Sequence, residues 1–334
     1  MASDRMMEYY YAMGQDCLHT GQYDDAVTYF RKAARMGAPE AAEERCRIGI
    51  RFETGDGVPA DEEKAHMCYE VSAEFDEAEA LFRLANIYLR GFRGARPNTR
   101  KARIFLERAS DAGDRESAAL LGKIHDEGIC GKVDTAKAFQ YYLLAAERGD
   151  TDSMLMTGLF YAQGDSVPKD LQEAESWIRK GASAHTPDGI ETLRIFLSVA
   201  CTEYAQSGND EKACAMAEEA EKLGNSEVWL HLGETYFAGN GPKCDGSAFR
   251  CFEKAVLSGS AESQAALGLC YESGSGTAED IDTAVSWYRK AAIQGNAFAM
   301  ARLGYACENG LGTEKDEKEA MEWLIKAAMK GDEG

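Results

Sequence analysis

The chain has 334 residues, of which 45% are hydrophobic, and its 57 acidic and 37 basic side chains give a net charge of −20. This balance argues against nucleic-acid binding, which requires a basic footprint, and is compatible with either a solvated surface or a partner with a basic face. The N-terminus lacks the apolar run of a secretory leader, and no stretch is apolar enough for a membrane helix. We therefore expect a cytoplasmic protein without membrane insertion.

An internal repeat of about 36 residues runs along the chain. One alanine in each copy marks its register, and adjacent copies are 35–39 residues apart: Ala26, Ala65, Ala102, Ala138, Ala174, Ala213, Ala248, Ala284 and Ala320. The repeat predicts an all-α solenoid of nine helix-turn-helix units in a single domain over residues 1–334. The approximate units are 5–37, 38–76, 77–113, 114–149, 150–185, 186–224, 225–259, 260–295 and 296–331.

The first helix of a unit contains a Leu-Gly step, which is clearest at Leu121-Gly122, Leu232-Gly233, Leu267-Gly268 and Leu303-Gly304. Glycine inside a helix costs about 1 kcal/mol relative to alanine. Its return in one register predicts a close helix crossing that no side chain can enter.

A Gly-x-Gly turn follows the first helix, at Gly55/Gly57, Gly239/Gly241, Gly274/Gly276 and Gly310/Gly312. The first glycine suits the left-handed conformation that ends a helix. Seven units then place an Asp or Asn four residues before the alanine, where it would cap the second helix: Asp61, Asn98, Asp134, Asp170, Asn209, Asp280 and Asp316. Asp170 with Glu173 and Asp316 with Glu319 predict capping boxes.

The second helix carries large side chains three and four residues after its alanine, as in Trp287-Tyr288, and small residues close the unit, as in Ala291-Ala292. Alanine and aromatic residues at this spacing form one apolar face. The full pattern closely resembles the Sel-one-like repeat (SLR), a relative of the tetratricopeptide repeat, most strongly over 225–331. The resemblance implies an α/α right-handed superhelix that acts as a protein-interaction scaffold and whose motif contains no catalytic residue.

Two units depart from the pattern. The sixth, 186–224, lacks both the Leu-Gly step and the glycine turn, which predicts a longer first helix. The third replaces the turn with a basic segment from Gly91 to Pro97.

Residues that could support chemistry do not form a recognisable site. The ten cysteines include no Cys-x-x-Cys pair and fall mostly on core positions, so we expect reduced structural thiols instead of zinc ligands or disulfides. The five histidines lie in unrelated registers, and the Gly-x-Gly turns follow no strand, unlike phosphate-binding loops. We expect no catalytic residue, no cofactor and no metal.

A basic stretch stands out within this acidic chain. Between Arg83 and Arg108 the net charge is +7, from Arg83, Arg90, Arg93, Arg96, Arg100, Lys101, Arg103 and Arg108 against Glu107. Guanidinium groups form bidentate bonds with carboxylates, so the stretch could bind an acidic segment. The alternative is a solvated loop that balances nearby acids.

The resemblance also predicts an inward face. In tetratricopeptide proteins this face takes positions −6, −3, −2, +1, +4 and +5 from the conserved glycine of the first helix. By this analogy the predicted partner-binding residues are Arg47, Arg83, Asn86, Arg90, Lys123, Leu155, Met156 and Leu159, together with Arg93 of the basic turn. Ile195 and Val199 fall on the same face of the sixth unit, unless they fill its irregular packing.

These observations predict a scaffold that binds a partner protein or an acidic peptide with a hydrophobic anchor. One alternative is a secreted or host-facing interaction protein of the same fold. Another is an enzyme that uses the groove as its active site.

Overall fold

A computed structural model describes residues 2–92, 95–129, 131–239 and 242–331. This part of the chain folds into 18 α-helices and one 3-10 turn and contains no strand. The chain divides into two compact units, 1–189 and 190–334. The predicted all-α solenoid of helix pairs is confirmed.

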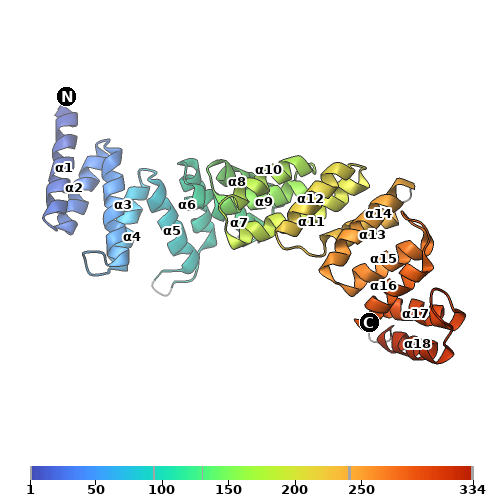
Figure 1. Ribbon diagram of the computed structural model, residues 1–334. Coiled ribbons are helices and arrows are strands. Elements are labelled where there is room, and N and C mark those ends of the chain that lie inside the picture. The colour runs from blue at the N-terminus through green and yellow to red at the C-terminus, as the bar shows by residue number, and fades with distance from the viewer. Residues whose placement is uncertain (1, 93–94, 130, 240–241, 332–334) are drawn as a thin grey trace. The chain divides into compact units, whose positions relative to one another are not determined.

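The first compact unit contains five helix pairs, each an antiparallel hairpin in Figure 1. Each helix packs against its partner and against the next helix along the chain. The helices are α1 (Ala2–His19), α2 (Tyr23–Arg35), α3 (Pro39–Thr54), α4 (Glu62–Ala73), α5 (Ala78–Arg90), α6 (Thr99–Asp111), α7 (Arg115–Asp126), α8 (Thr135–Glu147), α9 (Thr151–Gln163) and α10 (Leu171–Ala182).

The second compact unit repeats the arrangement. Its boundary lies in the first turn of α11, and its later helices again pack in sequential order. The helices are α11 (Pro187–Gln206), α12 (Asp210–Lys222), α13 (Val228–Ala238), α14 (Pro242–Ala255), α15 (Ala261–Ser273), α16 (Ile281–Ile293), α17 (Ala297–Asn309) and α18 (Glu317–Gly331), with η1 (Val256–Ser258) after α14.

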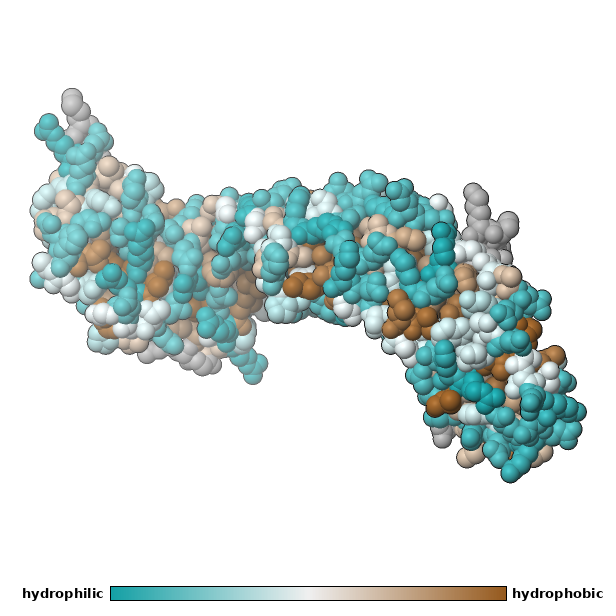
Figure 2. All heavy atoms as spheres, viewed as in Figure 1, coloured by the Kyte–Doolittle hydropathy of each residue, from teal (hydrophilic) through white to brown (hydrophobic). Residues whose placement is uncertain are grey.

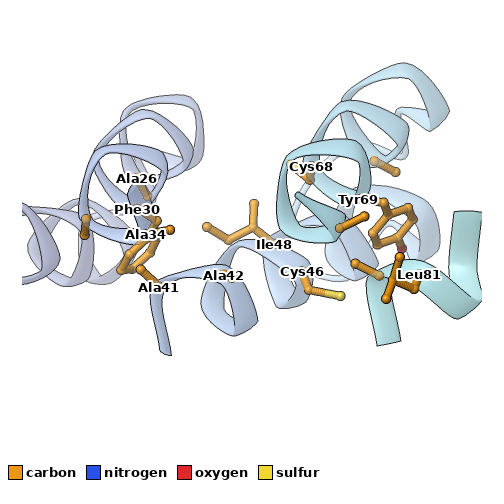
Figure 3. Close-up of a cluster of buried hydrophobic side chains, with 14 of the residues drawn as sticks. Ala26, Phe30, Ala34, Ala41, Ala42, Cys46, Ile48, Cys68, Tyr69 and Leu81 are labelled. Carbon is orange, nitrogen blue, oxygen red and sulfur yellow. The ribbon is translucent and has the colours of Figure 1, made fainter. Parts of the chain in front are cut away.

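The repeated alanine lies at the centre of every pair. All nine of these alanines are at most 2% exposed, because the two helices approach too closely for a larger side chain. Figure 3 shows this packing in the first unit, where Ala26 and Phe30 of α2, Ile48 of α3 and Tyr69 of α4 form one buried cluster.

The glycine of the first helix makes room for a large side chain of the second helix. A Cβ atom on Gly122 would lie 2.6 Å from the ring of Tyr142, and one on Gly268 would lie 2.9 Å from the ring of Tyr288. A side chain of the second helix occupies the space beside four further glycines in the same way: Gly49, Gly158, Gly233 and Gly304. The predicted close crossing is confirmed, and the fourth residue after the alanine fills it.

The predicted N-caps are confirmed at all seven positions, where each side chain accepts a hydrogen bond from a backbone N–H of the second helix. The prediction of capping boxes is wrong. The N–H of Asp170 bonds to the carbonyl of Tyr161, and that of Asp316 bonds to the carbonyl of Cys307. Because this N–H already has a partner on the first helix, Glu173 and Glu319 are not needed as acceptors. The cap residue therefore joins both helices of its pair.

The predicted glycine turns are confirmed in three units, where Gly55, Gly274 and Gly310 have φ of 77°, 70° and 71°. Gly239 is an exception. Its φ is −72° with ψ of 135°, so it is extended and not left-handed. Its companion Gly241 lies outside the described residues.

The sixth helix pair also follows the prediction. Helix α11 has 20 residues, against 11–18 for the other α-helices that the structure describes. Ile195 and Val199 on α11 are 51% and 53% exposed. They therefore do not fill the irregular packing of that pair, which was one of the two interpretations of these residues.

Candidate partner-binding groove

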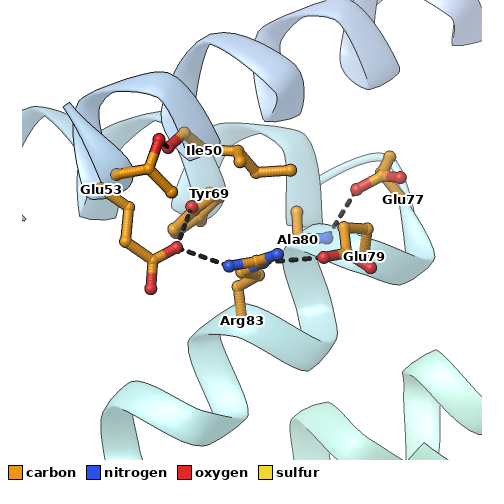
Figure 4. Close-up of polar contacts among 8 residues, drawn as sticks. Ile50, Glu53, Tyr69, Glu77, Glu79, Ala80 and Arg83 are labelled. Carbon is orange, nitrogen blue, oxygen red and sulfur yellow. Dashed lines mark hydrogen bonds and ion pairs between the residues drawn. The ribbon is translucent and has the colours of Figure 1, made fainter. Parts of the chain in front are cut away.

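Polar side chains join consecutive helix pairs through a contact that we call the inter-repeat bridge. In the first compact unit it consists of Glu53 on α3, Tyr69 on α4 and Arg83 on α5 (Figure 4). The Tyr69 hydroxyl donates to Glu53 Oε2 at 2.6 Å, and Arg83 Nη1 donates to the same oxygen at 2.7 Å. Arg83 Nε also donates to Glu79 at 2.7 Å.

The same bridge recurs in the second compact unit. Tyr288 donates to Glu272 Oε2 at 2.6 Å, and Arg302 donates to both oxygens of that carboxylate, with Nε 3.0 Å from Oε2. In both bridges the tyrosine is 16 and the arginine 30 residues after the glutamate. The repeat register therefore brings these three groups together.

The bridge also explains the protonation of its groups. Burial, then the hydrogen bond to Glu53, raises the pKa of Tyr69, so its hydroxyl stays a donor. Burial lowers the pKa of Arg83, but its hydrogen bond to Glu79 and the nearby Glu53 more than offset this, and the net pKa is raised. Arg83 is therefore a fixed structural cation with its fork already occupied.

The first helices α5, α7 and α9 form a groove of about 620 Å³ within the first compact unit. On the face in view in Figure 2, brown apolar side chains gather over the region of α7 and α9. The groove is lined by Phe82, Asn86, Glu116, Ala119, Leu120, Lys123, Asp126, Glu127, Tyr142, Asp150, Asp152, Ser153 and Met156. Positions −6, −3, −2, +1, +4 and +5 from Gly122 are all among them, so the inward register of tetratricopeptide proteins applies to α7.

Three of the predicted partner-binding residues, Asn86, Lys123 and Met156, meet at this groove. The placement of Leu155 needs correction. It is 6% exposed and packs beside Gly181, so it belongs to the core between α9 and α10. Leu159 is half-buried and is not among the residues that line the groove.

The other predicted cations lie elsewhere. Arg47 is exposed and pairs with Glu43 and Glu44 of its own helix at 2.7 and 3.0 Å. Arg90 lines a separate small pocket with Glu53 and Tyr69. Arg93 lies outside the described residues.

The groove has the opposite charge from the one that the sequence predicted. Five carboxylates, from Glu116, Asp126, Glu127, Asp150 and Asp152, line it together with a single ammonium group, that of Lys123. Lys123 lies 3.8 Å from Glu127. The floor of the groove is apolar. An acidic, apolar-floored groove favours cationic ligands.

The basic stretch is partly used within the chain. Arg108 pairs with Asp76 at 2.7 Å, Arg103 pairs with Glu107 at 3.3 Å, and Lys101 lies over the ring of Tyr88. Within the described part of the chain, Arg90, Arg96 and Arg100 have no ion-pair partner, and all three are exposed. They are the cations that remain available to an acidic segment.

Across the residues that the structure describes, the titratable groups do not assemble into a recognisable chemical site. The eight cysteines whose side chains the structure describes are thiols and not disulfides, and all of them except Cys214 are buried. His125 stacks on Tyr141, and burial, then Lys137, lowers its pKa. Over the described ranges, no three His, Cys, Asp or Glu side chains are placed to hold a metal ion, and no helix is long and apolar enough to cross a membrane.

Sequence reasoning missed the inter-repeat bridges and the acidity of the groove. A detectable signal was present, since an acid followed by tyrosine at 16 and arginine at 30 residues occurs twice in one register. Assigning residues to the face of one helix at a time does not reveal pairs that join neighbouring units.

Sequential helix pairs with capped, glycine-containing turns define an α-solenoid repeat protein. The Sel1 repeat model matches residues 8–37, 45–74, 78–114, 115–150, 151–185, 230–260, 261–296 and 297–332. The chain belongs to the Sel1 repeat family, as the resemblance predicted. The predicted unit 186–224 is the one without a match.

Two curated relatives illustrate the range of the family. DAP3-binding cell death enhancer 1 of Rattus norvegicus is 28% identical over 188 residues, covering 56% of this chain and 36% of the relative. Chitin synthase regulatory factor 3 of Schizosaccharomyces pombe is 27% identical over 271 residues, covering 79% of this chain and 25% of the relative. The chain therefore spans only about a third or a quarter of the length of these relatives.

A solved structure supports the fold. A protective antigen of uropathogenic Escherichia coli with an SLR fold aligns with a TM-score of 0.50 at 23% identity, covering 98% of this chain and 78% of that chain. Sel1 repeat proteins generally act as protein-interaction scaffolds, and their fold is typically non-catalytic.

Proposed function

We propose that this chain is a non-enzymatic binding module that holds a partner protein against the groove of α5, α7 and α9. The observation that supports the proposal is the groove itself, whose lining includes every inward-face position of α7. A groove that combines an apolar floor with charged walls offers both anchoring area and orientation to a polypeptide.

The names of two relatives are consistent with this role. One is called DAP3-binding and the other a regulatory factor of chitin synthase, and both descriptions imply action through another protein. The partner of this chain is identified below by its chemistry and not by these names.

Site-specific photo-crosslinking tests the proposal. A benzoylphenylalanine at position 123, in the groove, should capture a partner from extracts of the source organism. The same probe at position 104 is the control, because Ile104 is 52% exposed on the second helix α6, outside the groove. Equal capture from both positions would contradict the proposal that the groove is the partner-binding surface.

An acidic partner segment remains a prediction for the basic stretch. A third probe at position 100 tests it. Peptides crosslinked there should be rich in Asp and Glu, and a neutral or basic composition would contradict the prediction.

A further inference from the structure

One junction between helix pairs has an incomplete inter-repeat bridge. Asp126, Tyr142 and Met156 occupy the positions of the acid, the tyrosine and the arginine, with the same spacings of 16 and 30 residues. Methionine stands where Arg83 and Arg302 stand in the complete bridges. All three residues line the groove of α5, α7 and α9.

The missing arginine leaves two polar groups without a partner from the described part of the chain, and both remain open to water. Within the part of the chain that the structure describes, Asp126 has no ion-pair partner and the Tyr142 hydroxyl has no hydrogen-bond partner. Tyr142 is only 6% exposed, yet it forms part of the groove wall. Burial, then Asp126 and Glu127, raises the pKa of Tyr142, so its hydroxyl remains a donor at neutral pH.

Another junction with an open pocket lacks this arrangement. At the junction of α13 and α15 the residues in the same positions relative to the first-helix glycines are Phe237, Phe252 and Ala266, and they line an apolar pocket of about 410 Å³. That junction leaves no carboxylate at the bridge position. The incomplete bridge therefore differs both from the closed polar junctions and from the apolar one.

We propose that the groove binds an arginine side chain of the partner protein, which completes the bridge to Asp126 and Tyr142 from outside the chain. This rests on the proposed function, since it specifies the chemistry of the partner at the same groove. Arginine fits better than lysine because Arg302 shows what the position requires, a planar fork that reaches both oxygens of one carboxylate.

The surroundings of the incomplete bridge suit a basic segment with apolar neighbours. Glu116, Asp150 and Asp152 add negative charge along the wall, and Phe82 and Leu120 provide apolar contact area. The methylene stem of an arginine can lie along such side chains while its guanidinium group reaches the carboxylate. The occupant is therefore an arginine-containing segment of a protein, flanked by apolar residues.

The primary test uses two capped, fluorescein-labelled peptides of sequence Ala-Leu-Arg-Leu-Ala and Ala-Leu-Cit-Leu-Ala, where Cit is citrulline. Citrulline keeps the shape of arginine and removes its charge. Methyl-labelled methionine spectra of the full chain report binding through the Met156 signal, assigned with Met156→Leu. We expect the arginine peptide to shift this signal and to bind at least about tenfold more tightly than the citrulline peptide.

A gain-of-bridge variant separates binding from folding. Met156→Arg supplies the missing group from within the chain, as Arg302 does, so it should keep or raise the Tm while it abolishes binding of the arginine peptide. Met67→Arg is the matched control and should retain binding of the labelled peptide, because Met67 is 50% exposed on α4, outside the groove. Asp126→Asn should reduce the affinity for the arginine peptide to that for the citrulline peptide.

Three results would overturn the inference: equal binding of the two peptides, no shift of the Met156 signal by either, or undiminished binding by a folded Met156→Arg protein. The proposed function fails separately, if position 123 captures no partner. If Met156→Arg does not change capture at position 123, the proposed binding function stands. The inference that the partner inserts an arginine into the groove then fails.

Discussion

At the scale of single residues, the fold depends on glycines that leave space for a neighbouring side chain. Gly158 on α9 is one of the tightest cases. A Cβ atom there would lie 2.5 Å from Ile178 and 2.9 Å from the backbone carbonyl oxygen of Ala174. A side chain can change its rotamer, but the backbone carbonyl is held by α10. The site therefore cannot relax by side-chain movement alone.

We predict that Gly158→Ala lowers the free energy of unfolding by about 1–2 kcal/mol, since overpacking outweighs the gain in helix propensity. Gly246→Ala is the control, because Gly246 is also helical but has no atom within 4 Å of its Cβ position. That variant should be neutral or stabilised by up to about 1 kcal/mol. Urea unfolding followed by circular dichroism measures both, and equal effects would contradict the steric explanation.

The residue scale also shows why the predicted charge of the groove was wrong. The sequence identifies Arg47 and Arg83 as inward-facing, but it does not show that each already has acidic partners. The partner of Arg83 lies 30 residues earlier, on the preceding first helix. Such pairing depends on the superposition of units, which becomes visible only when corresponding positions of neighbouring repeats are compared.

At the scale of elements, the cap residue connects the two helices of a pair. The side chain of Asp170 accepts from the N–H groups of Gln172 and Glu173 at 2.8 and 3.1 Å, and its own N–H donates to Tyr161 of α9. The position of these caps was predictable because capping depends on local backbone geometry. The bond from the N–H of Asp170 to Tyr161 was not predictable, because it depends on how the turn folds back onto the first helix.

Removal of one cap should weaken its helix pair by a known amount. We predict that Asp170→Ala lowers the free energy of unfolding by about 1 kcal/mol, because the N–H groups at the start of α10 lose their acceptor. Asp165→Ala in the same connection is the control, since Asp165 is exposed and its side chain makes no hydrogen bond or ion pair within the described residues. Thermal unfolding of both variants compares them, and a loss of equal size would show that turn composition matters more than the cap.

At the scale of the whole molecule, the number of units, their order and their helical hairpins could be predicted from the sequence. The reason is that each unit contacts its neighbours in one register, so a pattern repeated along the chain specifies most of the packing. The position of the groove could be predicted, but its acidic, incompletely bridged character could not. Its character depends on Met156, where the chain departs from its own arginine-containing pattern.

Buried thiols occur in both compact units and should make the whole molecule sensitive to alkaline pH. Burial raises the pKa of Cys68 to about 11 and those of Cys201 and Cys251 to about 12. In the unfolded chain these thiols ionise near pH 8.5. The folded state therefore keeps protons that the unfolded state releases, so stability is complete below about pH 8.5 and falls as pH rises toward the folded pKa values.

We predict that the free energy of unfolding falls between pH 8.5 and 9.5, by up to about 1.4 kcal/mol per pH unit for each such thiol. The double variant Cys201→Ala/Cys251→Ala should show a shallower dependence, because it removes two of these protons. Urea unfolding at pH 7.5, 8.5 and 9.5 measures the slope for both proteins. The range stops at pH 9.5 so that tyrosines, which ionise near pH 10 when unfolded, contribute little. A wild-type slope of zero would mean that these thiols titrate alike in the two states, and that water reaches them in the folded protein.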